Sequence, residues 1–485
     1  MSNLPAWVIW LPLAGAAACW LVPALLTRFT AMAAAALTLS ATLSLALQVW
    51  HRGPAAYPIA GYSAPLGIEL MVDGLALWML LLSGVTNALI GIYAVLWFPA
   101  GRPGFWPLWL LLWGGLNALA LSADLFNLYV TLEIVSLCAV ALVTLSEERI
   151  ALTAATRYLL AAMLGSLTYL LGVALVYGEH GVLALTALSR LEQMGPASSV
   201  ALVLLTIGLL LKTAVFPFHF WLPLAHASAP APVSALLSAL VVKASFYLLI
   251  RLWLFVFGAL PLMAAAQVLG ALGAAAVLYG SVQALRQERL KLLVAYSTVA
   301  QLGYLVLAMP LVIGTAPDVR ALAYQGVAYH MMSHGLVKAA LFLAAGVVAR
   351  SYGHDRVAEL KGMATRLPVT TFVIALAAAS LIGLPPSGGF VAKWWLVSAA
   401  LQGGQLGWGL TLLLGGLLSA LYMFRLLAIG MPRGRPHEEP GNEPLALALP
   451  AFTLALAAVA IGLRSVELIE LLHVGAPFDL FGGRR

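Results

Sequence analysis

The chain has 485 residues, of which 63% are hydrophobic and 9% are charged, whereas soluble domains carry roughly 25% charged residues. This composition excludes a soluble globular domain and indicates a polytopic membrane protein. The formal net charge of +7 does not indicate a nucleic-acid partner, because the excess arginine lies in short segments between apolar stretches, where topology rules place it.

Apolar segments recur along the whole chain, and their length of about 18 to 25 residues suits helices that cross roughly 30 Å of hydrocarbon. They predict an all-α polytopic protein, since the short alternating strands of a β-barrel are not visible. The first apolar run follows no positive region, so it predicts a retained helix rather than a signal peptide. We expect about fourteen spans, which start near residues 6, 30, 75, 105, 125, 151, 199, 230, 258, 290, 321, 368, 405 and 444.

An even number of spans places both termini on one side of the membrane. Cytoplasmic loops carry an excess of Lys and Arg, and 14 of the 21 such residues outside the four lysines described below lie in or beside odd-numbered loops. The pattern therefore predicts cytoplasmic odd loops, non-cytoplasmic termini and a location in the cell (inner) membrane. These 14 residues are Arg28, Arg102, Arg149, Arg157, Arg286, Arg289, Lys291, Arg350, Arg356, Lys361, Arg366, Arg425, Arg433 and Arg435.

Two spans carry residues that interrupt a helix. The seventh reads LLLKTAVFPFHFWLPLAH, and its Pro217 removes a backbone donor and clashes with the preceding turn. The twelfth reads AASLIGLPPSGGFVAKWWL, with Pro385 and Pro386 followed by two glycines. Unwound backbone at membrane depth is tolerated where it is buried in protein or lines a wet cavity. Each break lies within eight residues of a lysine, which favours a functional break over the alternative of a packing kink.

The two broken spans are five helices apart, and an odd offset reverses the chain direction across the membrane. This spacing predicts two inverted-topology repeats with discontinuous helices at corresponding places. The first repeat, helices 4 to 8, covers residues 105–257, and the second, helices 9 to 13, covers 258–432. N-terminal helices 1 to 3 occupy residues 1–104, and helix 14 with a short tail occupies 433–485.

Charged residues inside the apolar spans are the strongest functional signal. Only six lysines occur in the chain, and four of them lie in such spans together with one glutamate. A charge at membrane depth is costly unless it is paired, hydrated or neutralised, so such residues mark ion or proton pathways. The pattern therefore predicts the movement of protons across the membrane through Glu133, Lys212, Lys243, Lys338 and Lys393.

Glu133, alone among apolar neighbours in LYVTLEIVSLCAV, is the natural partner for Lys212, and Lys243 follows in the next span. Desolvation disfavours the charged form of a lysine and a nearby carboxylate favours it. Moving the carboxylate would therefore switch the affinity of the lysine for a proton. The alternative is a static buried ion pair that determines only helix packing.

The segment YHMMSHGLVKAALF places His330, His334 and Lys338 at successive i, i+4 positions on one helix stripe. Histidine exchanges protons near neutral pH, so this stripe predicts a polar relay. One alternative is a histidine satisfied within the core. Another is a redox protein that binds haem or quinone, although two histidines four apart on one helix cannot both be axial ligands of one haem.

Three further residues flank the breaks. Lys393 follows the second break and would end the series, or it would snorkel to an interface beside Trp394 and Trp395. His219 and His226 both follow Pro217 and are predicted to feed protons into the first break from a surface or a neighbouring subunit. The alternative for either histidine is a packing role.

Other chemistry has no sequence support. The chain has no Walker loop, dinucleotide fingerprint or HExxH motif, and Cys19 and Cys138 lie in apolar segments, which supports neither a disulfide framework nor a thiolate metal cluster. We therefore predict a transporter subunit without cofactors, metal or catalytic chemistry of its own.

Five segments closely resemble the proton-conducting antiporter-like family, which includes large membrane subunits of respiratory complex I, membrane-bound hydrogenases and Mrp-type sodium/proton antiporters. The resemblance covers roughly residues 70 to 430. Its specific segments are SADLFNLYVTLEIVSL, LKTAVFPFHFWLPLAHASAPAPVSALLSALVVKASFYLLIR, LLVAYSTVAQLGY, YHMMSHGLVKAALFLAAGVV and GLPPSGGFVAKWWL.

The resemblance implies fourteen helices, two inverted five-helix repeats and broken helices 7 and 12. It also implies that Glu133 tunes Lys212, that Lys243 is a connecting site, that His330, His334 and Lys338 form the central relay, and that Lys393 lies on the exit side. The implied partners are other membrane subunits, the lipid bilayer, H⁺ and, as a further transported ion, Na⁺. A subunit of complex I or of a hydrogenase would be part of a redox-driven translocase.

Some residues depart from the pattern of the family. Leu224 stands in WLPLAH where many relatives have Asp, and Lys393 stands where some complex I subunits use Glu. The long lateral helix of the largest complex I subunit has no counterpart, and RSVELIELLHV predicts only a short amphipathic surface helix. These features favour a D-type Mrp or Mrp-like subunit, with a complex I or hydrogenase subunit as the alternative.

Overall fold

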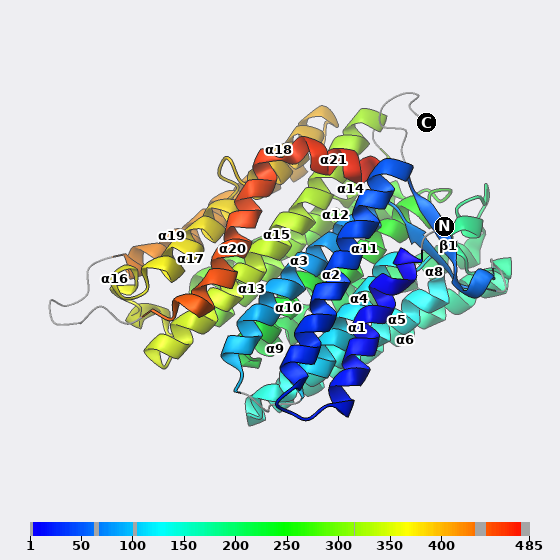
Figure 1. Ribbon diagram of the computed structural model, residues 1–485. Helices are drawn as coiled ribbons and strands as arrows, with labels where there is room; N and C mark the ends of the chain where they lie inside the picture. Colours follow the sequence, from blue (N-terminus) through cyan, green and yellow to red (C-terminus); the bar gives the residue numbers. More distant parts are fainter. Residues whose placement is uncertain (1–2, 63–66, 100–103, 315, 432–442, 477–485) are drawn as a thin grey trace.

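A computed structural model describes residues 3–62, 67–99, 104–314, 316–431 and 443–476 (Figure 1). Within these residues, twelve helical segments are long and apolar enough to cross a membrane, and two shorter apolar helices cover Phe105–Leu121 and Pro368–Ile382. Together they coincide with the fourteen predicted spans, so the predicted helical membrane fold is confirmed. Arg102, Arg433, Arg435 and the tail 477–485, which entered the sequence predictions, lie outside the described residues.

The N-terminal part contains a short sheet that the sequence analysis did not anticipate. Strands β1 (Ala55–Pro58) and β2 (Glu69–Val72) pair antiparallel, with Ala55 opposite Val72. They belong to the segment that joins two membrane helices, and their pairing satisfies backbone groups that would otherwise need water. The helices around them are α1 (Leu4–Leu21), α2 (Thr27–Arg52) and α3 (Gly74–Trp97), with the 3₁₀ turn η1 (Ile59–Gly61) after β1.

The middle of the chain forms spans four to eight. Its regular elements are α4 (Phe105–Leu121), α5 (Leu125–Val143), η2 (Thr144–Ser146), α6 (Arg149–His180), α7 (Leu185–Leu188), α8 (Pro196–Thr213), η3 (Phe218–Trp221), α9 (Leu222–Ser228), α10 (Ala231–Leu236), η4 (Leu237–Val241), α11 (Val242–Arg251) and η5 (Leu252–Val256). Segments η4 and η5 are π-helical, a rare conformation that occurs frequently at functional sites.

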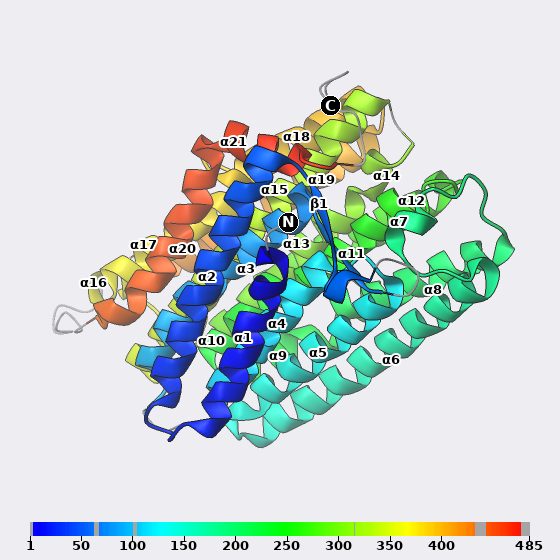
Figure 2. The same cartoon turned by 45° about the vertical axis from the view of Figure 1, so that its right-hand side comes forward.

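The remaining elements form spans nine to fourteen and a final short helix. They are α12 (Met263–Arg286), α13 (Leu290–Leu307), α14 (Met309–Val312), α15 (Pro317–Tyr352), η6 (Val357–Glu359), α16 (Met363–Arg366), α17 (Pro368–Ile382), α18 (Gly388–Gln402), α19 (Leu406–Gly430), α20 (Leu445–Leu463) and α21 (Ser465–His473). Figure 1 shows α15 in the middle of the bundle, with α6 and α8 on one flank and α17 and α19 on the other, and the turned view of Figure 2 again shows α6 at one edge and α17 at the opposite edge.

Both predicted helix breaks are present. Helix α8 ends at Thr213, and Ala214 follows in the left-handed conformation with φ of 58°, which is sterically costly for a residue with a side chain. Helix α17 ends at Ile382, Gly383 follows with φ of 94°, and α18 starts after Ser387, whose side chain accepts a bond from the Phe390 amide. The chain therefore unwinds at membrane depth in both spans.

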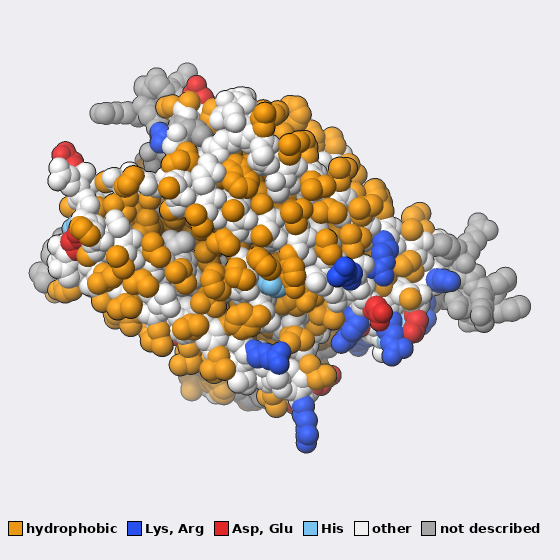
Figure 3. Space-filling view, turned by 180° about the vertical axis from the view of Figure 1, so that it is seen from behind, with side chains coloured by type: hydrophobic (Ala, Val, Ile, Leu, Met, Phe, Trp, Pro, Cys, Tyr) orange, Lys and Arg blue, Asp and Glu red, His pale blue; other side chains and the backbone are white. Residues whose placement is uncertain are grey.

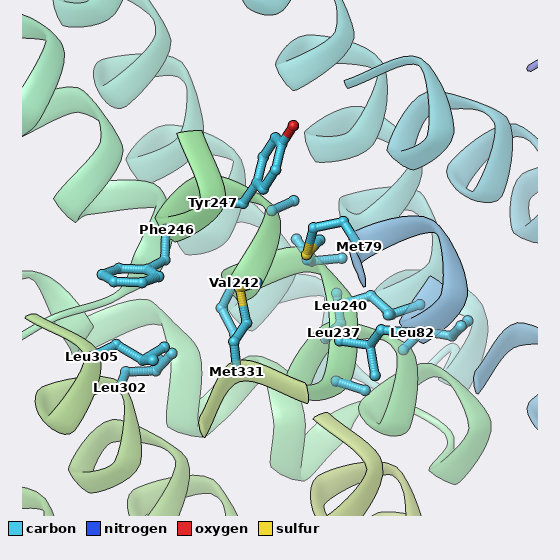
Figure 4. Packing of buried hydrophobic residues seen from close by; sticks show 14 of the residues in the cluster. Met79, Leu82, Leu237, Leu240, Val242, Phe246, Tyr247, Leu302, Leu305 and Met331 are labelled. Carbon is cyan, nitrogen blue, oxygen red and sulfur yellow. The ribbon is translucent and has the colours of Figure 1, made fainter. Parts of the chain in front are cut away.

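The most deeply buried elements are α15 and the segment from α10 to η5, whereas the outer helices expose apolar faces. Figure 4 shows how hydrophobic side chains of four elements pack together in this core: Leu237 and Leu240 of η4, Val242 of α11, Met79 and Leu82 of α3, and Met331 of α15. Figure 3 shows a largely hydrophobic surface on which Lys and Arg side chains gather at one end of the bundle. On this face, one end of the bundle therefore carries more positively charged side chains than the other end.

The predicted short helix near the C-terminal end is present as α21. It packs against the start of α3, where the Trp78 indole donates to the Leu468 carbonyl at 3.1 Å and the Gly74 amide donates to the Val474 carbonyl at 2.6 Å. A Cβ atom at residue 74 would lie only 2.2 Å from the Leu471 carbonyl oxygen, so this close approach requires glycine.

Candidate ion-translocation path

The first break brings together a lysine, a glutamate and a serine. Lys212 lies in the last turn of α8 and is 4% exposed. Its ammonium donates to Ser136 Oγ at 2.7 Å and lies 3.4 Å from Glu133 Oε1, both on α5. Glu133 is 24% exposed, so it lies at the edge of the bundle. The pair predicted from the sequence is therefore formed, but as a single long contact.

Close helix packing positions the lysine of this pair. Helices α6 and α8 approach each other at Gly165 and Gly208, where a Cβ on either residue would come within 3.0 Å of the opposite backbone. Small residues allow such close approach between membrane helices. The Lys212 stem lies against this contact, so the backbone of α6 holds it against α5.

The second lysine lies just beyond a π-helical turn. Lys243 is fully buried on α11, and its ammonium donates to the carbonyl of Ser238 in η4. The Ser238 hydroxyl is in turn 3.0 Å from Thr298 Oγ1 of α13. Lys243 therefore donates to a backbone carbonyl rather than to a carboxylate, and this carbonyl belongs to a residue in a row of hydroxyl groups.

The third lysine lies on the other side of that row. Lys338, fully buried on α15, donates to the Val294 carbonyl at 3.1 Å and to the Ser297 hydroxyl. Ser297 and Thr298 are neighbours on α13, so this helix connects Lys338 to the surroundings of Lys243.

The predicted histidine stripe of α15 leads away from Lys338. The His330 and His334 rings stack with centroids 5.7 Å apart, and Tyr304 of α13 stacks on His330 at 5.3 Å. His330 Nε2 lies 3.2 Å from the Gln301 carbonyl, a contact that favours a hydrogen-bonded histidine over a haem ligand. Neither His334 ring nitrogen has a hydrogen-bond partner among the described residues.

The fourth lysine binds carbonyl groups at the second break. Lys393 of α18 donates to the carbonyls of Leu381 and Ile382 at 2.7 and 3.0 Å. These are the last carbonyls of α17, at the negative end of its dipole. The ammonium also lies 4.6 Å from the centre of the Tyr304 ring, within cation–π range. Lys393 thus points back over the break, which does not fit the snorkelling alternative.

The two histidines after Pro217 have different surroundings. His219 on η3 lies against the rings of Phe216 and Tyr279, with centroids 5.6 and 4.8 Å away. His226 on α9 is completely buried, packs edge-on against Phe342 and has no partner for either ring nitrogen within the described chain. His226 also lies within electrostatic range of Lys243 and Lys338.

Together, these contacts make two groups. The first contains Glu133, Ser136 and Lys212, and the second extends from Lys243 through α13 and α15 to Lys393. Helices α8 and α11 pack against each other, but Lys212 and Lys243 share no hydrogen-bond partner in the described part of the chain. The path predicted from the sequence therefore has one step that no contact bridges directly.

The sequence analysis assigned no role to several polar residues that line this path. Ser136 contacts Lys212, and α13 supplies Ser297, Thr298 and Gln301. The α13 residues follow one another at i, i+1 and i+4 in an apolar span, a spacing that indicates one polar helix face. That spacing is the signal that could have revealed them.

A second buried ion pair was also missed. The Arg251 guanidinium on α11 donates to both carboxylate oxygens of Asp73, at 2.7 and 2.8 Å, and the two side chains are 1% and 4% exposed. Asp73 also accepts a bond from the Ala76 amide at 2.9 Å, so it is the N-cap of α3. This pair joins the start of α3 to α11.

The fold and site define a helical membrane protein with lysines aligned along its interior. Residues 122–420 match the family described as NADH:quinone oxidoreductase/Mrp antiporter, TM. The chain belongs to this family. The resemblance noted from the sequence segments is thereby confirmed.

Individual relatives and one solved structure are similar to this chain over most of its length. NADH-quinone oxidoreductase subunit N of Desulforudis audaxviator is 36% identical over 495 residues, which cover 97% of each chain. The D-type subunit of the Na(+)/H(+) antiporter of Alkalihalophilus pseudofirmus is 27% identical and aligns with 88% of this chain and 87% of its own. A chain in the structure of the Mrp complex from Dietzia sp. DQ12-45-1b superposes with a TM-score of 0.89 at 26% identity, covering 97% of this chain and 96% of that one.

Proposed function

We propose that this chain is a proton-translocating subunit of a multisubunit membrane complex. The observation that carries the proposal is the set of four lysines at membrane depth, of which only Lys212 has a carboxylate partner within 4 Å among the described residues. Apolar surroundings disfavour the charged form of a lysine and so make release of its proton possible nearer to neutral pH, and ionisable residues inside membrane helices mark ion pathways.

In this proposal Glu133 controls the proton affinity of Lys212, and Lys243 connects that pair to the central group. Lys338, His334 and His330 form the central relay, while Lys393 holds the proton beside the second break. His219 and His226 are the proposed groups through which protons enter. The hydroxyl groups of α13 support the proposal. Each hydroxyl can both donate and accept a hydrogen bond, so it can take part in a chain of groups that passes a proton.

The arrangement of the repeats and the topology belong to the same proposal. Residues 105–257 and 258–432 would form the two inverted repeats, each with one broken helix. Odd loops would face the cytoplasm and both termini the opposite side of the inner membrane, as the excess of Lys and Arg favours. Na⁺ is a further candidate substrate, because the relative from Alkalihalophilus pseudofirmus is named as part of a Na(+)/H(+) antiporter.

The driving force depends on the partner subunits. A D-type Mrp or Mrp-like subunit remains our first candidate, since Lys393 fits that class and a chain of a solved Mrp complex superposes over almost its full length. A redox-driven complex is the second candidate, because the relative at 36% identity is named NADH-quinone oxidoreductase subunit N. Purification of the native complex decides between them. Partner subunits with iron-sulfur clusters would indicate a redox-driven complex, and small membrane partner subunits would indicate an antiporter.

The direct test of the function is Lys212→Ala in the whole complex. We expect proton transport into everted membrane vesicles, followed with a pH-sensitive dye, to fall to background while the complex still assembles. Lys212→Arg is the control that keeps the charge but cannot release a proton. Loss of assembly would instead support a static ion pair, and normal transport in variants of all four lysines would make the chain a passive scaffold.

A further inference from the structure

A polar cavity of about 420 Å³ lies beside the second half of the broken seventh span. The segments that line it follow α3, α5, α9, α12 and α15, so it lies at the end of the bundle that carries the odd loops. Its titratable residues are Glu148, Arg289, Lys291, His354 and Asp355. Arg289 is 53% exposed, so the cavity reaches the surface.

Lys291 forms the inner wall of this cavity. It lies beside an odd-numbered loop, as the second residue of α13, and its side chain is half-buried. Its ammonium donates to the Ala229 carbonyl at 2.6 Å, in the link between α9 and α10. Lys291 therefore joins the cavity to the segment that follows the first break.

Asp355 binds the start of α13 through hydrogen bonds. It accepts bonds from Arg289 Nε at 2.9 Å and from the main-chain amide of Lys291 at 3.3 Å. This carboxylate is thus occupied at the start of α13. The Lys291 ammonium has a carbonyl as its hydrogen-bond partner, and a carbonyl compensates its charge less than a direct carboxylate contact would.

The same helix carries the connection inward. Lys338 donates to the Val294 carbonyl, and Val294 follows Lys291 by three residues, which is a rise of about 4.5 Å along an α-helix. His226, in the helix that ends beside the cavity, lies within electrostatic range of Lys291, Lys338 and Lys243. On α13, the residue that lines the cavity and the carbonyl that binds Lys338 are therefore less than one helical turn apart.

We propose that this cavity is the aqueous vestibule of the proton path and that Lys291 passes protons between the vestibule and the central site. The inference rests on the proposed function. The Lys291 ammonium releases a proton to a neutral acceptor of the central site, Lys338 or His226, and the resulting amine takes a proton from hydronium in the vestibule. Charge moves one step inward, and no further reactant is needed.

The first test compares three substitutions in the whole complex. Lys291→Met removes the carrier, and Lys291→Arg keeps the charge and a donor for Ala229 but cannot release a proton. Both variants should lower proton transport about tenfold or more, as the loss of a proton-transfer group does. Lys361→Met, an exposed lysine at the same end of the bundle, is the matched control and should leave transport unchanged.

The outcomes separate this inference from the proposed function. Full transport with Lys291→Arg would show that only the charge matters and would overturn the role as a proton carrier. Unchanged transport with Lys291→Met, together with loss in Lys212→Ala, would overturn the inference and leave the function intact. Unchanged transport in both would contradict the function itself.

A second test probes the vestibule and remains decisive if Lys291→Met does not assemble. Ser228→Cys is introduced with Cys19 and Cys138 replaced by serine, and the complex is treated with a charged thiosulfonate from the side of the odd loops. Modification should lower transport about fivefold or more, since it fills a water-accessible proton route. Arg356→Cys, at a residue 71% exposed on the same end, should be modified without effect. If the reagent does not modify Ser228→Cys, the cavity is not accessible to water from this side and the proposed vestibule is wrong.

Discussion

Among the described residues, two ion pairs that join membrane helices of this bundle are built in opposite ways. Asp73 and Arg251 are almost completely buried, share two short hydrogen bonds and include a helix cap. Glu133 and Lys212 share one contact of 3.4 Å, and Glu133 is 24% exposed. The lysine makes its shorter bond, 2.7 Å, to Ser136.

The difference separates a pair that stabilises from a pair that can change. A bidentate contact with a capping bond uses most of the acceptor sites of the carboxylate, so any rearrangement loses several bonds at once. A single long contact can be broken or shortened at small cost. We therefore assign the Asp73–Arg251 pair to the fold and the Glu133–Lys212 pair to transport.

The largest expected effect comes from breaking the rigid pair. Asp73→Asn leaves the Arg251 charge buried without a counter-charge, which should lower the free energy of unfolding by about 3 to 5 kcal/mol. Thermal unfolding of the purified complex and the assembled fraction in membranes are the measurements. Glu133→Gln, measured in parallel, should change the free energy of unfolding by only about 1 kcal/mol or less. Equal destabilisation by both substitutions would remove the distinction between the pairs.

The next effect is on transport. Glu133→Gln removes the charge that favours protonated Lys212, and we expect proton transport to fall about tenfold or more, the equivalent of roughly 1.4 kcal/mol. The complex should still assemble, which the yield of partner subunits checks. Glu133→Asp, which keeps the charge on a shorter side chain, should retain an intermediate rate. Wild-type transport in Glu133→Gln would contradict a role for this pair in the mechanism.

The parts of the molecule that follow from local chemistry were predictable. Pro217 and Pro386 disrupt helices through their own rings, and a lysine in a membrane span is anomalous whatever surrounds it. These local signals predicted the two breaks and drew attention to the four lysines of the membrane spans. They also predicted that Glu133 would pair with Lys212, because Glu133 stands alone among apolar neighbours in LYVTLEIVSLCAV.

The parts that depend on packing were not predictable in the same way. Asp73 and Arg251 are 178 residues apart, and nothing in either neighbourhood indicates the other. Lys291 resembles a loop charge because it follows Glu288 and Arg289, and its inward position depends on the link at Ala229. The strands β1 and β2 could not be predicted from the sequence pattern, because four residues are too few to establish an alternation of polar and apolar residues.

The smallest effect concerns the serine beside Lys212. Ser136→Ala removes a hydrogen bond of 2.7 Å, and such a bond contributes about 1 kcal/mol net, so transport should fall about fivefold. Ser136→Thr keeps the hydroxyl and is the matched control. Proton uptake by reconstituted vesicles is the measurement.

Combining this substitution with Glu133→Gln tests whether both groups act on the same ammonium. If they do, the double variant should lose less transport than the product of the two single losses, since groups that share one partner are coupled. Ser136 and Glu133 lie on one face of α5, three residues apart, and both contact Lys212 Nζ. Strictly multiplicative losses would mean that Ser136 acts elsewhere, and Lys212 would then have Glu133 as its only functional partner.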